Sequence, residues 1–78
     1  MLLTLNTEEA LSVINNPFAK SKIVQLNIHY DVDFSGKNKW YAEVKFRNGL
    51  TKGQQTTPFC ETLEEVGKQI DLILASVR

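Results

Sequence analysis

The sequence predicts a two-layer α+β domain of order α-β-β-β-α, in which both helices pack on one face of a three-stranded antiparallel meander. Three observations predict this fold. Residues 22–47 alternate between apolar and polar side chains with a period of two, which is typical of a β-hairpin with one buried face. Residues 6–16 and 62–77 carry apolar side chains at helical spacing. Because the hairpin offers a single apolar face, both helices are expected on that face.

The N-terminal region is expected to form one short helix after a brief lead-in. Residues 1–5 are either a frayed end or a short extra strand at the edge of the sheet. Asn6 is placed to cap the helix with its side-chain oxygen, and Glu9 stands at the third helical position of a capping box. Pro17 ends the helix, because the residue before a proline disfavours helical geometry. Phe18, in the connector that follows, is expected to plug one end of the core.

Two long strands are expected over residues 23–33 and 39–47. The loop between them contains Gly36, which can adopt the positive φ that a tip requires. The inward positions of both strands are apolar and would form the sheet side of the core: Val24, Leu26, Ile28, Tyr30, Val32, Trp40, Ala42, Val44 and Phe46.

The register of these two strands is set by the loop that joins them, and one hypothesis pairs Val32 with Trp40. That pairing would place His29 opposite Glu43. A histidine beside a carboxylate can act as a general acid–base group or a pH sensor. The sequence shows no Gly-rich phosphate loop and no nucleophile elbow. We therefore predict no enzyme activity, no catalytic residue and no cofactor.

A third strand is expected over residues 50–57. Asn48 and Gly49 before it form a strong hairpin-turn signal and predict a type I′ turn. Gly53, inside the strand, predicts a β-bulge. Pro58 ends the strand and suits an edge position, because proline cannot donate to a ladder.

The last helix is expected to begin after Thr62, its N-cap, with Glu65 as the capping-box partner. Gly67 lies on the apolar side of this helix, where a missing side chain would allow close approach to the strands. The apolar stripe is wide enough to cover a sheet and contains Leu63, Val66, Ile70, Ile73, Leu74 and Val77.

Composition places the chain among ordinary globular proteins, as one domain over residues 1–78. It is 42% hydrophobic and 23% charged, which argues against disorder. With a formal net charge of zero, the chain lacks the overall positive charge that is typical of nucleic-acid binders. The apolar run at residues 1–5 is too short for a signal-peptide core or a membrane span.

Cys60 is the single cysteine, and the chain has a single histidine. One thiol cannot form an internal disulfide, and this pair is too small for a protein-only zinc site, so no metal is predicted. The composition suits a reducing compartment, and a cytoplasmic location is expected. Cys60 lies just before the last helix, where its thiolate would be favoured; alternatively it is a small, partly buried residue of a connector.

The outward face of the hairpin is the strongest candidate for binding a partner. It carries Gln25, Asn27, His29, Asp31, Tyr41, Glu43, Lys45 and Arg47. Tyrosine and arginine are common interface anchors, and we predict His29, Tyr41, Lys45 and Arg47 as partner-binding residues. The alternative is a solvated face with routine cross-strand pairs.

Charge is unevenly distributed along the chain. Residues 36–52 hold five basic residues against one acidic residue, a net charge of +4, whereas residues 61–78 hold four acidic against two basic residues, a net charge of −2. The basic ridge of the tip and second strand contains Lys37, Lys39, Lys45, Arg47 and Lys52. It could bind phosphates or an acidic protein, or its lysines could protect the sheet from aggregation.

The predicted order α-β-β-β-α and the length of the chain resemble those of the double-stranded RNA-binding domain family. In that family, contact with RNA depends on a lysine-rich first turn of the last helix. The corresponding stretch here, residues 60–65, contains Glu61, Glu64 and Glu65 and would repel phosphates. The resemblance is therefore one of element order, and it assigns no RNA-binding residue to this chain.

These observations predict a non-enzymatic protein-binding module, such as an adaptor, an inhibitor or a homodimerising protein. The binding region would be the polar outer face of the sheet or the open edge after the third strand. The alternative is a nucleic-acid-binding domain that uses the basic ridge.

Overall fold

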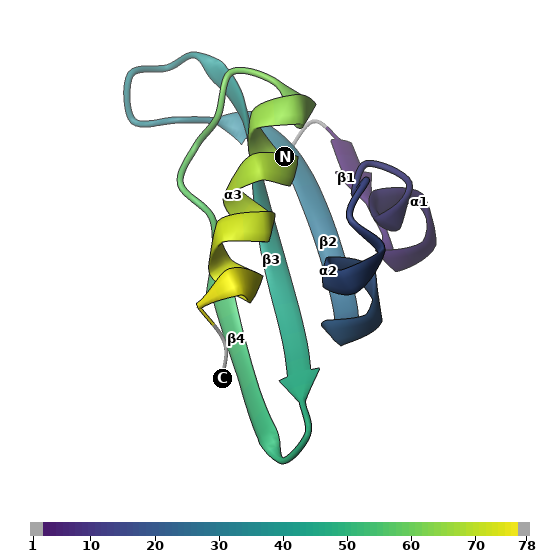
Figure 1. Cartoon of the computed structure of the whole chain (residues 1–78). Coiled ribbons are helices and arrows are strands. Elements are labelled where there is room, and N and C mark those ends of the chain that lie inside the picture. The colour runs from purple at the N-terminus through teal and green to yellow at the C-terminus, as the bar shows by residue number, and fades with distance from the viewer. Residues whose placement is uncertain (1–2, 77–78) are drawn as a thin grey trace.

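The computed structural model describes residues 3–76 and shows a four-stranded antiparallel sheet with three helices (Figure 1). The elements in chain order are β1 (Leu3–Leu5), α1 (Thr7–Leu11), α2 (Pro17–Lys22), β2 (Ile23–Val32), β3 (Asn38–Asn48), β4 (Thr51–Thr56) and α3 (Leu63–Ala75). The strands lie side by side in sequence order. The predicted α+β class is confirmed, and of the two alternatives for the N-terminal residues, the structure shows the extra strand.

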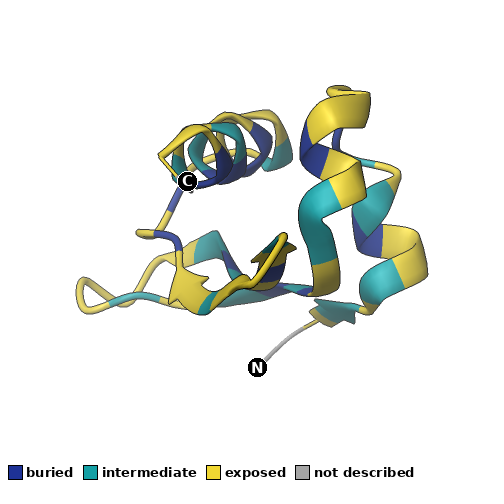
Figure 2. Cartoon of the chain, turned by 60° about the horizontal axis from the view of Figure 1, so that its bottom comes forward, coloured by how far each residue is buried: buried dark blue, intermediate teal, exposed yellow. Residues whose placement is uncertain are grey.

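The helices lie together on one face of the sheet, as predicted, and leave the other face uncovered (Figure 2). The core fills the space between these two layers. It comprises Ala10, Ile14, Ala19, Leu26, Ile28, Ala42, Val44, Phe46, Cys60, Val66, Ile70 and Leu74. The predicted stripe of the last helix faces this core, except that Val77 lies outside the described residues. We call the uncovered side the outer face of the sheet.

The N-terminal helical region consists of two short helices, α1 and α2, where the sequence predicted one helix and a connector. Asn6 is the N-cap residue of α1, but its side chain makes no capping hydrogen bond. Asn16, the N-cap residue of α2, does make a capping hydrogen bond: its side chain accepts from the Phe18 backbone N–H at 3.0 Å. Pro17 occupies the first position of α2, which is favourable for proline. This helix turns Ala19 inward and leaves Phe18 74% exposed, so the prediction that Phe18 plugs the core is wrong.

The register of β2 and β3 differs by two residues from the predicted register. Val32 pairs with Asn38 and Tyr30 pairs with Trp40. The reason lies in the tip, where the Asp33 carboxylate accepts hydrogen bonds from the backbone N–H groups of Ser35 and Lys37 at 2.8 and 3.0 Å.

These bonds close a five-residue loop, so the ladder continues further toward the tip than predicted. Gly36 supplies the expected positive φ, at 83°. The hydrogen bonds from Ser35 are the chief reason that the pKa of the Asp33 carboxyl is lowered from its ordinary value.

The β-bulge lies in β2 and not at Gly53 as predicted. The register shifts between Ile23 and Gln25, so Val24 is the extra residue; it is 62% exposed instead of facing the core. Ile23 takes the inward position opposite Phe46. Gly53 pairs regularly with Phe46, and the Phe46 ring lies across it so closely that a Cβ atom there would be 2.5 Å from the ring Cζ.

The turn between β3 and β4 is of type II′, not the predicted type I′. Asn48 pairs with Thr51, which leaves Gly49 and Leu50 as the two loop residues. Gly49 has a φ of 65°, and the described residues other than glycine all have negative φ. A glycine at the first loop position with positive φ is the type II′ pattern.

α3 begins as predicted, after an N-cap at Thr62. The Thr62 Oγ1 accepts a hydrogen bond from the Glu65 backbone N–H at 3.2 Å. The Glu65 carboxylate reaches the backbone N–H of Glu61 at 3.1 Å, one residue earlier than a capping box requires. Gly67 faces the backbone oxygen of Val13, which would lie 3.5 Å from a Cβ atom at this position, so the close approach is to the N-terminal region and not to the strands.

Candidate binding surface on the outer face of the sheet

The central strand β3 presents its polar residues to the outer face. Tyr41, Glu43, Lys45 and Arg47 alternate with residues that are buried under the helices. Three of the four predicted partner-binding residues therefore share one row on an uncovered surface.

His29, the fourth predicted residue, also lies on the outer face but is only 6% exposed. Its Nε2 is 2.6 Å from Glu43 Oε1, its Nδ1 is 3.2 Å from Thr4 Oγ1, and its ring lies 4.9 Å from the Tyr41 ring. The predicted His29–Glu43 contact exists, although it runs diagonally, because Tyr41 is the residue directly opposite His29. His29 thus links β1, β2 and β3 and orients two residues of the surface.

The order hydroxyl, imidazole and carboxylate, from Thr4 through His29 to Glu43, is also the order of a hydrolase relay. Such a relay requires the imidazole to take a proton and return it to the leaving group of a substrate. With the ring held against Tyr41 and 6% of the residue exposed, a leaving group has little access to it. What the contacts show is a linkage of β1, β2 and β3 through the His29 side chain.

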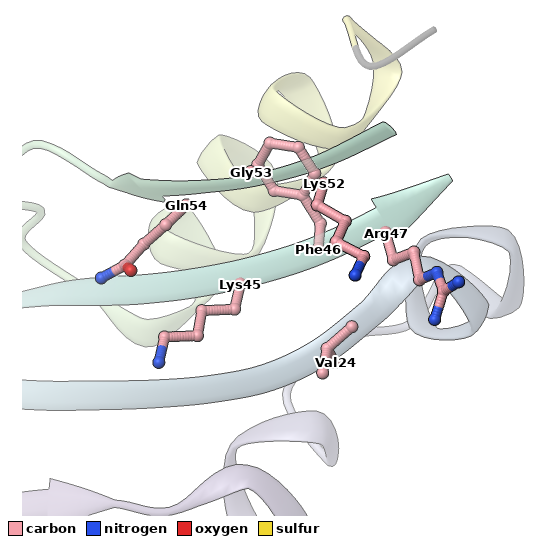
Figure 3. A pocket seen from close by; sticks show the side chains of 7 residues that line it. All are labelled: Val24, Lys45, Phe46, Arg47, Lys52, Gly53 and Gln54. Atoms are coloured by element: carbon pink, nitrogen blue, oxygen red, sulfur yellow. The ribbon is translucent and has the colours of Figure 1, made fainter. Parts of the chain in front are cut away.

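A concavity of about 470 Å³ lies at the end of the outer face that is next to the β3–β4 turn (Figure 3). We call it the basic concavity, and its lining residues are Val24, Lys45, Phe46, Arg47, Lys52, Gly53 and Gln54. The strand register explains the gathering of cations, because Arg47 pairs with Lys52, and Lys45 pairs with Gln54. Figure 3 shows these polar side chains projecting from β3 and β4 to the same side of the sheet.

Within residues 3–76, no carboxylate forms an ion pair with a cation of the basic concavity. Arg47 donates from Nε to the Gly49 backbone oxygen at 3.1 Å, which holds the guanidinium beside the turn. Lys39 behaves differently: its Nζ lies 2.5 Å from Glu61 Oε1 and 3.8 Å from Asp33 Oδ2. The hydrogen bond to Glu61 is the chief reason that the pKa of Lys39 is raised.

The predicted basic ridge is therefore divided in two. At the tip of the β2–β3 hairpin, Lys39 is neutralised by acidic neighbours. At the other end, three cations remain together with the exposed side chain of Val24. Sequence reasoning missed the contribution of Val24, and the signal for it was the pair Ile23–Val24, two consecutive apolar residues that interrupt the strict alternation.

A second feature of the outer face is an aromatic cluster, which we define as Phe34, Tyr41 and Phe59. The Phe59 ring contacts the Tyr41 ring at 5.2 Å between centroids and the Phe34 ring at 6.2 Å, both edge to face. Phe34 is fully exposed and Phe59 is 37% exposed. Sequence reasoning missed both phenylalanines. Phe59 faces outward because its neighbour Cys60 bridges to Trp40 and is buried.

Burial raises the pKa of one titratable group within this cluster, Tyr41, and of one beside it, Cys60. The pKa of the Tyr41 hydroxyl is raised, first by desolvation and then by the charges of Asp31 and Glu43. Desolvation also raises the pKa of the Cys60 thiol. Cys60 is thus the small buried residue of the second interpretation, and its Sγ donates to the Pro58 oxygen at 3.3 Å. Over residues 3–76, no three His, Cys, Asp or Glu side chains are grouped to hold a metal ion.

The helical side of the molecule has smaller grooves. The larger, of about 200 Å³, lies between α2 and α3 and is lined by both Lys22 and Asp71. One oxygen of Asp71, Oδ1, is buried without a hydrogen-bond partner among the described residues. These grooves combine opposite charges, so they lack the single-sign character of the basic concavity.

The chain matches no family model, no curated protein sequence and no solved structure. The helices within residues 3–76 are all too short or too polar to span a lipid bilayer.

Proposed function

We propose that this chain is a small non-enzymatic protein-binding module, and that its basic concavity binds an acidic segment of a partner protein. The observation that carries the proposal is the position of Arg47 directly opposite Lys52, with Lys45 two residues away on the same face of β3. This is a concentration of positive charge in a chain whose formal net charge is zero.

The physical reason is that like charges in a cross-strand pair oppose folding. Such a pair destabilises a sheet, and a bound carboxylate would turn this repulsion into attraction. The guanidinium of Arg47 can bind a carboxylate through two parallel hydrogen bonds. Val24 and Gln54 beside it offer an apolar contact and an amide to the rest of the segment.

An acidic protein suits the surface better than a nucleic acid because of Glu43. Its carboxylate lies on the same face of β3, two residues from Lys45, and its side chain is partly exposed. A nucleic acid carries a negative charge at every nucleotide and would bring a phosphate close to this carboxylate. A protein segment can place an uncharged residue there.

Nucleic acid remains the alternative, and one observation favours it. The aromatic cluster and the basic concavity lie on the same open sheet face, and single-stranded nucleic acids bind to surfaces that combine stacking rings with cations. That alternative predicts an affinity that falls steeply with salt.

Self-association through the sheet edge is a further form of the proposal. β4 borders only β3, so its outer edge is open within the described sheet, as predicted. Antiparallel pairing of β4 with β4 of a second copy would bring two basic concavities side by side. The resulting repulsion favours a different protein over a second copy as the partner.

The test uses a peptide of alternating serine and glutamate, acetyl-SESESES-amide, its glutamine counterpart and an eight-residue oligothymidylate. Binding to the uniformly ¹⁵N-labelled protein is followed by NMR titration. We expect the glutamate peptide to shift the amide signals of Lys45, Arg47 and Lys52, and to bind at least about tenfold more tightly than the glutamine peptide, as expected for several charge-assisted hydrogen bonds.

The Lys45→Glu/Arg47→Glu variant is expected to lose this binding without unfolding, because both side chains are exposed. Lys20→Glu/Lys68→Glu is the matched control, since it makes the same charge change at exposed helical positions. Equal affinity of the two variants for the glutamate peptide would contradict the proposal. Tighter binding of the oligothymidylate than of the peptide would favour the nucleic-acid alternative instead.

A further inference from the structure

We infer, on the basis of this proposed function, what the recognised segment looks like. It is extended, it runs along β3, and it carries an aromatic side chain at one position and acidic side chains four and six residues from it. The aromatic side chain packs on the aromatic cluster, and the acidic side chains enter the basic concavity. The position two residues from the aromatic side chain is not acidic.

The aromatic cluster supplies the first contact. Three adjoining rings, of which Phe34 is fully exposed, form a continuous apolar patch on the outer face. A single exposed apolar residue is ordinary in proteins, but joined aromatic rings in line with a charged concavity are typical of interface anchors. Rings prefer edge-to-face contact, which the exposed face of Phe34 can offer to an aromatic side chain of a partner.

The spacing follows from the outer row of β3. Tyr41 belongs to the aromatic cluster, and Lys45 and Arg47 belong to the basic concavity, four and six residues further along the same strand. At about 3.3 Å per residue, these separations are about 13 and 20 Å. An extended partner segment has the same rise, so its own residues at i, i+4 and i+6 match these positions.

Alternation of side chains makes the spacing selective. In an extended segment, residues separated by an even number of positions point to the same side. An aromatic residue at i and acidic residues at i+4 and i+6 therefore all face the sheet, whereas acidic residues at i+3 and i+5 would face away from it.

Glu43 defines the middle of the site. It lies between Tyr41 and Lys45 in the outer row, and the 2.6 Å contact with His29 Nε2 holds its carboxylate in place. A residue of the segment at i+2 would lie over this carboxylate. A neutral or basic residue is acceptable there, and an acidic one is repelled.

The inference is tested with blocked heptapeptides in the same NMR titration. WSSSESE and its reverse, ESESSSW, carry the inferred spacing in the two chain directions. ASSSESE and ESESSSA lack the aromatic residue. WSSESES moves the acidic residues to i+3 and i+5 from the tryptophan, and WSESESS places one acidic residue over Glu43. All six have the same charge.

We expect at least one of the two tryptophan peptides with the inferred spacing to bind about five- to tenfold more tightly than its alanine counterpart, as expected for an added aromatic contact. WSSESES and WSESESS are expected to lose most of this gain. Phe34→Ala should abolish the gain for the tryptophan peptide and leave the affinity of the alanine peptide unchanged. Leu72→Ala, an exposed apolar residue on α3, is the control and should change neither.

The outcomes separate this inference from the proposed function. If the alanine peptides bind in a manner that depends on Lys45 and Arg47 but tryptophan adds less than a twofold gain, the inference is overturned and the proposed function stands. A gain that survives Phe34→Ala, or that is equal for WSSESES, also overturns the inference. If no acidic peptide binds, both fail.

Discussion

Phe46 and Gly53 show how one missing side chain sets the local packing of a strand pair. The Phe46 ring crosses over Gly53 on the neighbouring strand. It fills the space that a side chain at position 53 would otherwise occupy. The sequence indicated an irregularity at Gly53, but a bulge and a covered glycine look alike in one dimension. Only the position of Phe46 in the adjacent strand distinguishes them.

Gly53→Ala is expected to destabilise the protein by about 1–3 kcal/mol, the usual cost of overpacking. The reason is that the new Cβ atom would lie 2.5 Å from Phe46 Cζ. Urea unfolding measures the change in the free energy of unfolding. In a Phe46→Leu background the same substitution should cost clearly less, because the ring is absent; an equal cost in both backgrounds would show that the clash is not the cause.

The buried thiol of Cys60 makes the free energy of unfolding depend on pH in the alkaline range. Burial raises the pKa of its thiol from the ordinary 9.0, so the folded state holds the proton more tightly than the unfolded state does. The resulting stabilisation is fully present below pH 9 and is lost as the pH rises through the folded-state pKa. Tyr41, whose pKa is raised from 10.0, acts in the same direction at somewhat higher pH.

We therefore expect the free energy of unfolding to decrease above pH 9, and to decrease less in Cys60→Ala than in the wild-type protein. Iodoacetamide should also alkylate Cys60 more slowly in the folded protein than in urea at the same pH. Identical pH profiles for the two proteins would argue against a buried, protonated thiol.

At the scale of secondary-structure elements, capping explains why the helices were predicted with different success. Thr62 and the spacing of the residues after it located the start of α3. Asn6 has an equally favourable residue type, but its side chain makes no capping bond, and Asn16 caps α2 instead. Both asparagines precede helix-forming residues, so residue type alone cannot say which one engages a backbone N–H.

Thr62→Ala is accordingly expected to lower the free energy of unfolding by about 1 kcal/mol, the typical value of an N-cap hydrogen bond. Asn6→Ala should cost less than about 0.5 kcal/mol, as for a surface substitution that removes no contact. Thermal and urea unfolding of the two variants provide the comparison. A larger effect at Asn6 than at Thr62 would mean that the Asn6 side chain caps α1 in solution.

At the scale of the whole molecule, stability depends on the packing of α3 against the sheet. Ile70 is fully buried in the core, whereas Leu72, two residues later, is 64% exposed. A domain of this size has a thin core and little stability in reserve. The loss of one core side chain therefore affects the folding of the entire chain.

Ile70→Ala is expected to destabilise the protein by about 2–5 kcal/mol, enough to unfold a large fraction of the molecules at 37 °C. Leu72→Ala should change the free energy of unfolding by less than about 0.5 kcal/mol. Circular dichroism during urea titration separates the two cases. Similar effects of both substitutions would be incompatible with α3 packing on the sheet through one face.

The candidate site was predictable only in part, again at the scale of the whole molecule. Tyr41, Lys45 and Arg47 were placed on the outer face by alternation alone, and the structure shows them there. Lys52 belonged to the predicted ridge, but its position opposite Arg47 required the register of β4. Phe34 and Phe59 were missed because one lies at a hairpin tip and the other in a connector, where no periodicity reports which way a side chain points.

The sequence by itself determined the α+β class, the hairpin, the last helix and the division of β3 into an inner and an outer row. These features follow from local periodicity and from caps and turns, which act over a few residues. Only the tertiary structure decided the register of β2 and β3, the bulge at Val24 and the assembly of the basic concavity. The physical reason is that a shift of two residues leaves every side chain on the same face, so alternation cannot select among such registers. That choice depends on hydrogen bonds and strand pairings that alternation does not report, such as the closure of the tip by Asp33 and the pairing of Arg47 with Lys52.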